Sequence, residues 1–364
     1  MTRRSKITEG MSHMIKVGIL GLAHGHVFNY GGEWIAHPET YGIEIAGAWD
    51  HDAARLESDA PKLKARPFES AEALLASGID AAVISSETAY HAELAEKAAA
   101  AKKDIILYKP MALTMAEADR IVEAVNKNGV RFTMGWQMRV DPQNVKMKEL
   151  VETKALGEVT LYRRRHALGT QTWAGFENTW HVDPKLNRDI FADDSSHPID
   201  MMQWMFGMPE TVSCEMSTML NPKVKNDNGV ALFRYANGLI CEISCCFTCV
   251  ASEITTEIYC ANGSIQQYFG DNPGARLPRL KDMEGLKWYR EGDKDWTNSG
   301  IPSPAGHGLR IRDQAGPLAD FLKGGKSICT AEEGRNSLRL VLACYLSARE
   351  GRRVSVWDER IAEI

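Results

Sequence analysis

The chain has 364 residues, of which 44% are hydrophobic and 25% are charged, and its formal net charge is −5 at pH 7. This length predicts about two domains, because a single core rarely grows beyond ~250–300 residues. The charge gives no reason to expect nucleic acid as a partner, and no apolar run approaches the ~20 residues that a membrane span needs.

Residues 1–13 read as an N-terminal tail. The pair Arg3-Arg4 resembles the start of a twin-arginine export signal, but no small-residue cleavage site follows it. The first apolar run lies at 15–20, where we expect a strand.

A glycine-rich turn follows that strand in the segment I-K-V-G-I-L-G-L-A-H-G-H (15–26). A strand followed by a tight turn and a helix N-terminus is the arrangement that binds the pyrophosphate of a dinucleotide. The match to G-x-G-x-x-G begins at Gly21. It is incomplete, because Ala23 and His26 occupy the second and third glycine positions and Gly25 comes one place early. A plain strand-to-helix turn therefore stays open as an alternative.

Strand-like and helix-like segments alternate from 15 to 135. This alternation predicts a Rossmann-type, doubly wound parallel sheet with helices on both faces, in a dinucleotide-binding domain over 14–138. Further strands are expected at 43–49, 81–85, 105–108 and 130–134, and helices at 91–101 and 114–128, the second opening with a capping box.

The rest of the chain, 139–364, is expected to form an α+β domain that binds substrate and mediates oligomerisation. Two Asn-Gly pairs, at 237–238 and 262–263, favour hairpins and hence a large, mostly antiparallel sheet. The final helix is expected to pack back on the first domain. We predict helices at 142–152, 197–206 and 331–349; strands at 159–165, 211–216, 229–235, 239–249, 253–260 and 353–357; an irregular stretch up to about 192; and a surface loop at 270–310.

Eight cysteines raise the question of metal binding or disulfides. Strand alternation over 239–249 places Cys241, Cys245 and Cys249 on one apolar face, where cysteine behaves as a small hydrophobe. We therefore expect reduced cysteines in a cytoplasmic protein, and no metal site.

Two positions at strand ends are candidate ligands. Asp50 ends the second strand, where a carboxylate accepts the hydroxyls of an adenine ribose, although acidic residues are also common in solvated loops. Lys109 follows a strand and precedes Pro110, which restricts its backbone. A lysine at this edge of a parallel sheet is suited to donate to a substrate oxygen, but a surface lysine is the ordinary alternative.

Asp193, His197 and Asp200 are spaced by four and three residues, so a helix would place them on one face. Histidine is the side chain best suited to proton transfer near neutral pH, and a neighbouring carboxylate can orient it. The alternative is that 193–196 merely caps a helix that starts at Pro198.

These segments together resemble the glucose–fructose oxidoreductase / inositol 2-dehydrogenase (Gfo/Idh/MocA) family of NAD(P)-dependent sugar oxidoreductases. The resemblance spans nearly the whole chain. Its motifs are V-G-I-L-G, I-S-S-E-T-A-Y-H (84–91) against A-T-P-N-x-x-H, Y-K-P (108–110) against E-K-P, G-W-Q-M-R (135–139), D-D-S-S-H-P-I-D (193–200) against D-x-G-x-H-x-x-D, and S-A-R-E-G-R-R-V (347–354).

The resemblance implies that Lys109, Asp193 and His197 are catalytic. His197 would accept the hydroxyl proton, Lys109 would polarise that oxygen, and Asp193 would orient its neighbours. The implied cofactor is NAD, with NADP not excluded because His51 and Arg55 are near Asp50. Expected cofactor residues are Gly21, Ala23, His24, Gly25, His26, Asp50, His51, Ser85, Ser86, Thr88, His91, Lys109, Pro110 and Gln137; expected substrate residues are His166, Trp173, Asn178, Trp180 and Asp194.

The chain departs from the family pattern at several of these positions. Tyr108 replaces the glutamate of E-K-P, so we expect the amine of Lys109 to be held less firmly as a cation. Glu87 and Thr88 replace proline and asparagine, and Ser195 replaces a frequent glycine.

We therefore expect a dehydrogenase that transfers hydride between the nicotinamide cofactor and a sugar, polyol or related cyclic alcohol. One alternative is a glycosidase of the same fold that oxidises its substrate transiently, with 167–190 binding the glycoside. Another is a dinucleotide-binding sensor without turnover. The resemblance also implies a homo-oligomer, a dimer or tetramer that buries the open face of the hairpin sheet.

Overall fold

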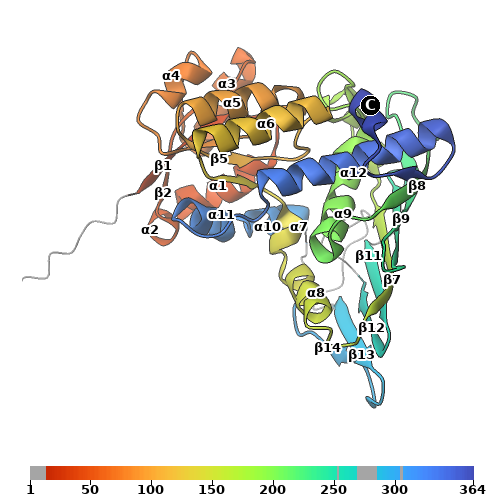
Figure 1. Cartoon of the computed structure of the whole chain (residues 1–364). Coiled ribbons are helices and arrows are strands. Elements are labelled where there is room, and N and C mark those ends of the chain that lie inside the picture. The colour runs from red at the N-terminus through yellow and green to blue at the C-terminus, as the bar shows by residue number, and fades with distance from the viewer. Residues whose placement is uncertain (1–13, 252–253, 269–284, 304–305) are drawn as a thin grey trace, which may run out of the picture.

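The computed structural model describes residues 14–251, 254–268, 285–303 and 306–364 (Figure 1). Its first sheet has six strands in the order β3-β2-β1-β4-β5-β6, all paired in parallel. This confirms the predicted doubly wound sheet. The strands are β1 (Ile15–Leu20), β2 (Ile43–Trp49), β3 (Arg66–Pro67), β4 (Ala81–Ile84), β5 (Asp104–Leu107) and β6 (Phe132–Met134).

Helices cover both faces of this sheet (Figure 1). Helices α4, α5 and α6 pack on one face, and Thr114 and Glu117 form the expected capping box at the start of α6. On the other face lies α1, together with α10 and α11 from the end of the chain. The helices are α1 (His26–Ala36), α2 (Pro38–Tyr41), α3 (Ala53–Asp59), α4 (Ala71–Leu75), α5 (His91–Ala100), α6 (Met115–Asn128), α10 (His307–Arg312) and α11 (Ala315–Leu322).

The return of α10 and α11 to the first sheet was not part of the predicted domain division. The apolar side chains of Leu318 and Phe321 are buried beside α1, and the indole nitrogen of Trp34 donates to the carbonyl of Ala315 at 2.9 Å. The stretch 139–364 therefore contributes to the core of the first domain as well as to its own.

The second sheet has nine strands in the order β14-β13-β12-β11-β7-β10-β9-β8-β15. Its pairs are antiparallel except β7 with β10, which is the predicted mostly antiparallel sheet. The strands are β7 (Val159–Ala167), β8 (Thr211–Ser217), β9 (Asn228–Arg234), β10 (Ile240–Cys246), β11 (Thr255–Cys260), β12 (Gly263–Gln267), β13 (Leu286–Arg290), β14 (Thr297–Asn298) and β15 (Val354–Ser355).

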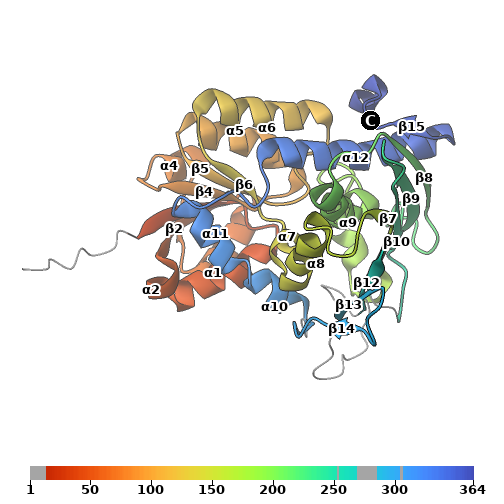
Figure 2. The same ribbon diagram turned by 60° about the horizontal axis from the view of Figure 1, so that its bottom comes forward.

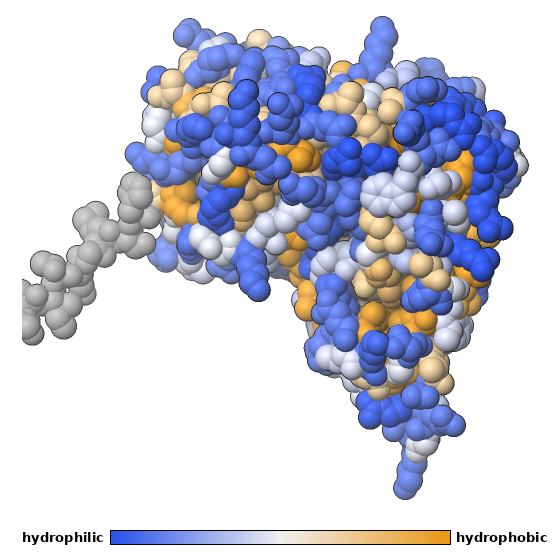
Figure 3. All heavy atoms as spheres, viewed as in Figure 1, coloured by the Kyte–Doolittle hydropathy of each residue, from blue (hydrophilic) through white to orange (hydrophobic). Residues whose placement is uncertain are grey.

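Helices lie against one face of this sheet in both ribbon views (Figure 2). They are α7 (Gln137–Val140), α8 (Pro142–Glu152), α9 (Ile190–Phe206) and α12 (Ala331–Glu350). The long helix α12 also contacts α6, as expected for a final helix that packs back on the first domain. The outward side chains of Val230, Leu232 and Ile240 are exposed, and Figure 3 shows orange residues among blue ones along this flank of the molecule.

Three expectations for the second half are corrected. Helix α9 begins at Ile190 and is capped by Asp189, so residues 193–196 lie inside the helix and the capping interpretation of that segment is wrong. Strands β13 and β14 and most of α10 lie within the stretch expected as a loop, although 270–284 lie outside the described residues. The irregular stretch before α9 contains three 3-10 turns, at Thr170–Thr172, Phe176–Asn178 and Trp180–Val182.

The cysteines follow the expected pattern with one exception. All eight are free thiols, and Cys241 and Cys245 are buried. Strand β10, however, ends at Cys246, so Cys249 lies beyond it, only partly buried, with its sulfur 3.5 Å from that of Cys246. Within the described residues no group of three or more potential ligands is placed to hold a metal ion, and no helix there is long and apolar enough to cross a membrane.

Candidate active site

A cavity of about 430 Å³ lies between the two sheets, next to the carboxyl end of β5. Ligands of parallel α/β sheets bind at this edge, and the volume is within the range of small-molecule sites. Lys109, two residues past β5, and His197, on α9, both line it, so the amine and the imidazole converge on one space. The lining residues are His24, Gly25, His26, Lys109, Leu168, Trp173, Phe176, His181, Ile190, Asp193, Asp194 and His197.

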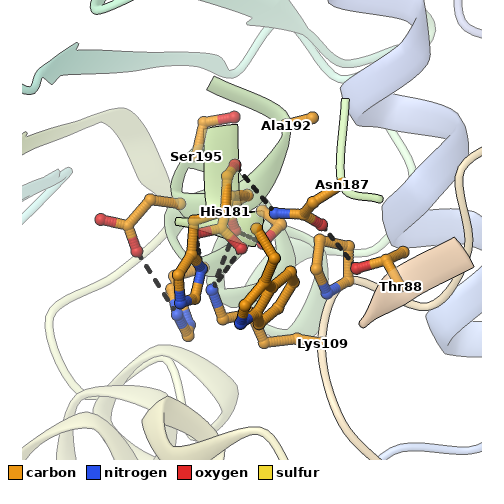
Figure 4. A network of polar contacts seen from close by, with 12 residues as sticks. Thr88, Lys109, His181, Asn187, Ala192 and Ser195 are labelled. Carbon is orange, nitrogen blue, oxygen red and sulfur yellow. Dashed lines mark hydrogen bonds and ion pairs between the residues drawn. The ribbon is translucent and has the colours of Figure 1, made fainter. Parts of the chain in front are cut away.

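Asp193 connects Lys109 to His181, and Figure 4 labels the two residues that it joins. The Nζ atom of Lys109 donates to Asp193 Oδ1 at 2.9 Å, and the other oxygen lies 3.0 Å from His181 Nδ1. Burial acts to raise the pKa of Asp193, but the charges of Lys109 and His181 outweigh it and hold this pKa well below its ordinary value. Asp193 thus gives the amine of Lys109 a carboxylate partner, although position 108 is a tyrosine.

His197 is a buried, neutral imidazole. Burial and the nearby charge of Lys109 lower its pKa well below the ordinary value. Its ring packs edge-on against Trp136 at 5.3 Å, and the amide nitrogen of Gln137 lies 3.3 Å from its Nδ1. A neutral ring nitrogen facing the cavity is able to accept a proton.

Asp194 lies between two imidazoles. Its Oδ1 is 3.5 Å from Nε2 of His197, and its Oδ2 is 3.5 Å from Nε2 of His166, which is buried on β7. Two of the five residues expected to bind substrate therefore lie near His197. Asp194 lines the cavity, whereas the buried His166 does not.

The third acid of the signature has a different role. Asp200 lies two turns beyond Asp193 on α9 and accepts two hydrogen bonds from the guanidinium of Arg139, each 2.8 Å. Asp200 does not line the cavity. It forms a buried ion pair that fixes α9 against α7.

The turn after β1 fits the diphosphate of a dinucleotide. Gly21 has φ +86°, and a Cβ atom there would lie 2.4 Å from the Cα of Ser86, so no other residue fits. No side chain caps α1, while Gly25 and His26 at its start line the cavity. A helix start without a side-chain cap, beside a cavity that also contains Lys109, suits an anionic ligand.

His24 projects from this turn toward the catalytic groups. Its ring is 2% exposed, and neither ring nitrogen has a hydrogen-bond partner among the described residues. Burial, followed by the charge of Lys109, lowers its pKa well below the ordinary value. His24 is therefore neutral, and its ring nitrogens are buried in the wall of the cavity.

Asp50 lies where the sequence predicts, but its acceptor positions are occupied. Arg55 donates to both of its oxygens at 2.8 Å, and the backbone nitrogens of Leu22 and Asp52 donate to Oδ2 and Oδ1 at 2.7 and 2.8 Å. A carboxylate has about four acceptor positions. Asp50 therefore has none left for a ribose hydroxyl.

Other expected cofactor residues hold the loops around the cavity. His91 is buried and bridges two loops, with Nδ1 2.9 Å from the carbonyl of Pro110 and Nε2 3.2 Å from that of Ser86. The hydroxyl of Ser85 donates to the carbonyl of His24, and the hydroxyl of Thr88 donates to Asn187 (Figure 4). His91, Ser85, Ser86, Thr88 and Pro110 do not line the cavity, so their effect on a ligand is through the loops that they position.

The aromatic residues expected to bind substrate are divided between different places. Trp173 lines the cavity and is 43% exposed, at its mouth. The indole of Trp180 instead donates to the carbonyl of Ala23 at 3.1 Å and so joins the second domain to the phosphate turn. Asn178 lies outside the cavity lining, with its amide 3.4 Å from Glu177. Sequence reasoning missed three lining residues, Leu168, Phe176 and Ile190. It expected His181 only within the segment 167–190 that would bind a glycoside.

Comparison with known proteins agrees with this geometry. Residues 15–136 match the model of an oxidoreductase family with an NAD-binding Rossmann fold, and residues 144–266 match the model of the GFO/IDH/MocA C-terminal domain. The chain belongs to the GFO/IDH/MocA family. It is therefore an oxidoreductase with an NAD-binding domain, as its motifs indicate.

Its relatives act on several sugars and polyols. D-apiose dehydrogenase from Paraburkholderia graminis is 25% identical over 86% of this chain and 84% of its own length. Myo-inositol 2-dehydrogenase from Thermotoga maritima is 26% identical over 76% of this chain and 80% of its own length.

Solved structures share the fold over almost the whole chain. Levoglucosan dehydrogenase in complex with NADH and L-sorbose superimposes with a TM-score of 0.80 at 19% identity, covering 94% of this chain and 98% of that one. A probable dehydrogenase from Thermotoga maritima gives a TM-score of 0.74 at 22% identity, with 94% and 99% covered.

Proposed function

We propose that this protein is an NAD-dependent dehydrogenase that acts on a hydroxyl group of a sugar or polyol, with Lys109, Asp193 and His197 as its catalytic residues. One observation carries the proposal. A salt-bridged amine and a neutral imidazole, 88 positions apart in the chain, line the same cavity beside the uncapped N-terminus of α1.

When bound, NAD supplies the acceptor for the hydride that leaves the substrate's carbon. Lys109 Nζ, held by Asp193, donates a hydrogen bond to the oxygen on that carbon and stabilises the negative charge that develops there. His197 takes the hydroxyl proton on a ring nitrogen, since burial keeps it neutral beforehand. In the reverse direction the same imidazole returns the proton.

The remaining polar groups of the cavity would bind the rest of the substrate. Asp194 offers an acceptor next to His197 and is held from behind by the buried His166, and the exposed ring of Trp173 offers a flat apolar face at the mouth. Vicinal hydroxyls with an apolar C–H face match this set. Relatives named for D-apiose and myo-inositol support substrates of this class.

We further propose a homo-oligomer formed through the outer face of the nine-stranded sheet. Exposed Val230, Leu232 and Ile240 on neighbouring strands β9 and β10 give that face apolar surface, which association would remove from water. The eight free thiols support the proposed cytoplasmic location, where thiols stay reduced.

A test of the proposal measures NADH formation by the purified protein with NAD and a panel of sugars and polyols. We expect Lys109→Ala to lower kcat by about 10²–10³-fold, the loss typical for a group that stabilises a developing oxyanion. Lys127→Ala, at an exposed position of α6, is the control and keeps the wild-type rate. A Lys109→Ala protein that turns over at the wild-type rate would show that the catalytic assignment is wrong.

A further inference from the structure

A second carboxylate lies beside Asp50, and one of its oxygens is unused. Glu87 Oε1 is 2.8 Å from Nη2 of Arg55, whereas Glu87 Oε2 has no hydrogen-bond partner among the described residues. The side chain is only 4% exposed. Leaving a buried polar atom without a partner costs free energy. A bound ligand that donates a hydrogen bond to this oxygen would remove that cost.

Glu87 is well placed to meet the adenosine half of the cofactor. It lies three residues past β4, whose neighbour in the sheet is β1, and β1 in turn pairs with β2, which ends at Asp50. The preceding residue, Ser86, packs directly against Gly21 of the phosphate turn. A dinucleotide with its diphosphate at this turn therefore extends its adenosine ribose toward both carboxylates.

His51 covers the unused oxygen without bonding to it. Its Nδ1 lies 3.7 Å from Glu87 Oε2 and 3.4 Å from Asp50 Oδ1, and its ring packs on that of Tyr90 at 4.4 Å. The side chain of His51 is 35% exposed. Its contacts with both carboxylates are longer than the hydrogen bonds of Arg55, so we infer that a ribose hydroxyl displaces His51 from Oε2.

The charges of the cluster favour a hydroxyl over a phosphate. Asp50 and Glu87 share the single guanidinium of Arg55, which leaves one net negative charge before His51 is counted. Both carboxylates are nearly inaccessible to water, where repulsion of a further anion is strong. A ribose 2′-phosphate would add negative charge at this place.

We propose that Glu87 accepts the hydrogen bond of the adenosine 2′-hydroxyl, that Asp50 and Arg55 position Glu87 and the phosphate turn, and that this cluster selects NAD over NADP. The inference rests on the proposed function, because it concerns the cofactor of the same site. It moves the ribose ligand from the end of β2, where the sequence predicts it, to the loop after β4.

The test compares dissociation constants, by calorimetry, for NAD and for an analogue without the adenosine 2′-hydroxyl. In the wild-type protein we expect the analogue to bind about 10–100-fold more weakly, as for a hydrogen bond to a charged acceptor. In Glu87→Met, which keeps the side-chain length without an acceptor, that difference falls to less than about threefold. In the wild-type protein we expect NADP to have a larger dissociation constant than NAD. In Glu87→Met the ratio of these two constants falls by about tenfold or more.

Three further variants make the result specific. Glu87→Asp keeps the negative charge but moves the carboxylate oxygens away from the ribose. We therefore expect this variant to lose most of the affinity that the 2′-hydroxyl contributes and to keep its preference for NAD over NADP. It also serves if Glu87→Met does not fold. Asp50→Asn weakens NAD binding because Asp50 holds the phosphate turn at Leu22. In this variant the analogue without the 2′-hydroxyl still binds more weakly than NAD by the wild-type factor. Asp52→Asn removes a charge from the same loop, where Asp52 only caps α3, and changes neither quantity.

The inference is overturned if the penalty for the missing hydroxyl stays at its wild-type size in both Glu87 variants, or if it disappears in Asp50→Asn. In those cases NAD still binds and the catalytic assignment stands. If the wild-type protein binds no NAD, the proposed function fails together with this inference.

Discussion

The substitution Asp200→Asn tests whether Asp200 stabilises the fold, in contrast to Asp193 on the same helix, which is proposed to be catalytic. Asp200 accepts hydrogen bonds from Nε and Nη2 of Arg139 at 2.8 Å and from the hydroxyl of Ser337 at 2.6 Å. Both charged side chains are at most 1% exposed. The amide nitrogen of asparagine would face an N–H group of Arg139 and leave that buried cation with only the partly exposed Glu333 as a counter-charge.

Breaking a buried ion pair from one side costs about 3–5 kcal/mol. At about 2 °C per kcal/mol for a chain of this size, the melting temperature measured by circular dichroism falls by about 6–10 °C. Below that temperature the variant keeps most of its turnover, because Asp200 does not line the cavity.

The matched control is Glu333→Gln. Glu333 lies 3.1 Å from the same guanidinium but is 43% exposed, and glutamine keeps the capping box at the start of α12. We expect a loss below about 1 kcal/mol. The reasoning is refuted if Asp200→Asn melts like the wild-type protein, if the control loses as much, or if folded Asp200→Asn is as inactive as Lys109→Ala.

Two further predictions concern pH and substrate binding. Burial lowers the pKa of His91 to about 4, against about 6.5 when unfolded, so only the unfolded state takes up its proton in this range. The contribution of neutral His91 to the free energy of unfolding is therefore greatest above pH 6.5 and falls by about 2 kcal/mol between pH 7 and 5. In His91→Asn, the pH dependence of the free energy of unfolding, measured by urea denaturation, should correspond to about one proton fewer. An unchanged pH dependence would contradict the assignment. Trp173→Ala should raise KM about tenfold with kcat retained, since its exposed ring only stacks on the substrate; a fall in kcat at unchanged KM would exclude that role.

The first domain and the start of α8 in the second could be predicted closely because their signals are local. The β-branched run at 15–20, the capping box at Thr114 and the Asp141-Pro142 helix start each act within a few residues, and all three appear as expected. The position of Lys109 also follows from one strand end. Such features need no knowledge of the rest of the chain.

The features that were missed depend on distant partners. The carboxylate of Asp50 accepts hydrogen bonds from Arg55 and from the backbone nitrogen of Leu22. No spacing rule predicts these contacts. The segment 170–182 folds into short 3-10 turns without periodicity, so nothing marked His181 as the partner of Asp193. Pro198 resembled a helix start, yet it lies inside α9, where Asp189 caps an earlier turn.

The return of α10 and α11 to the first sheet has a mechanical consequence. The backbone passes between the two lobes three times: after β6, before α10, and again between α11 and α12. A hinge motion would have to bend all three connections together, and α12 contacts both lobes along its length. We therefore infer that the two lobes keep their relative position, and that small molecules enter and leave the cavity past side chains and the short turns at 170–182.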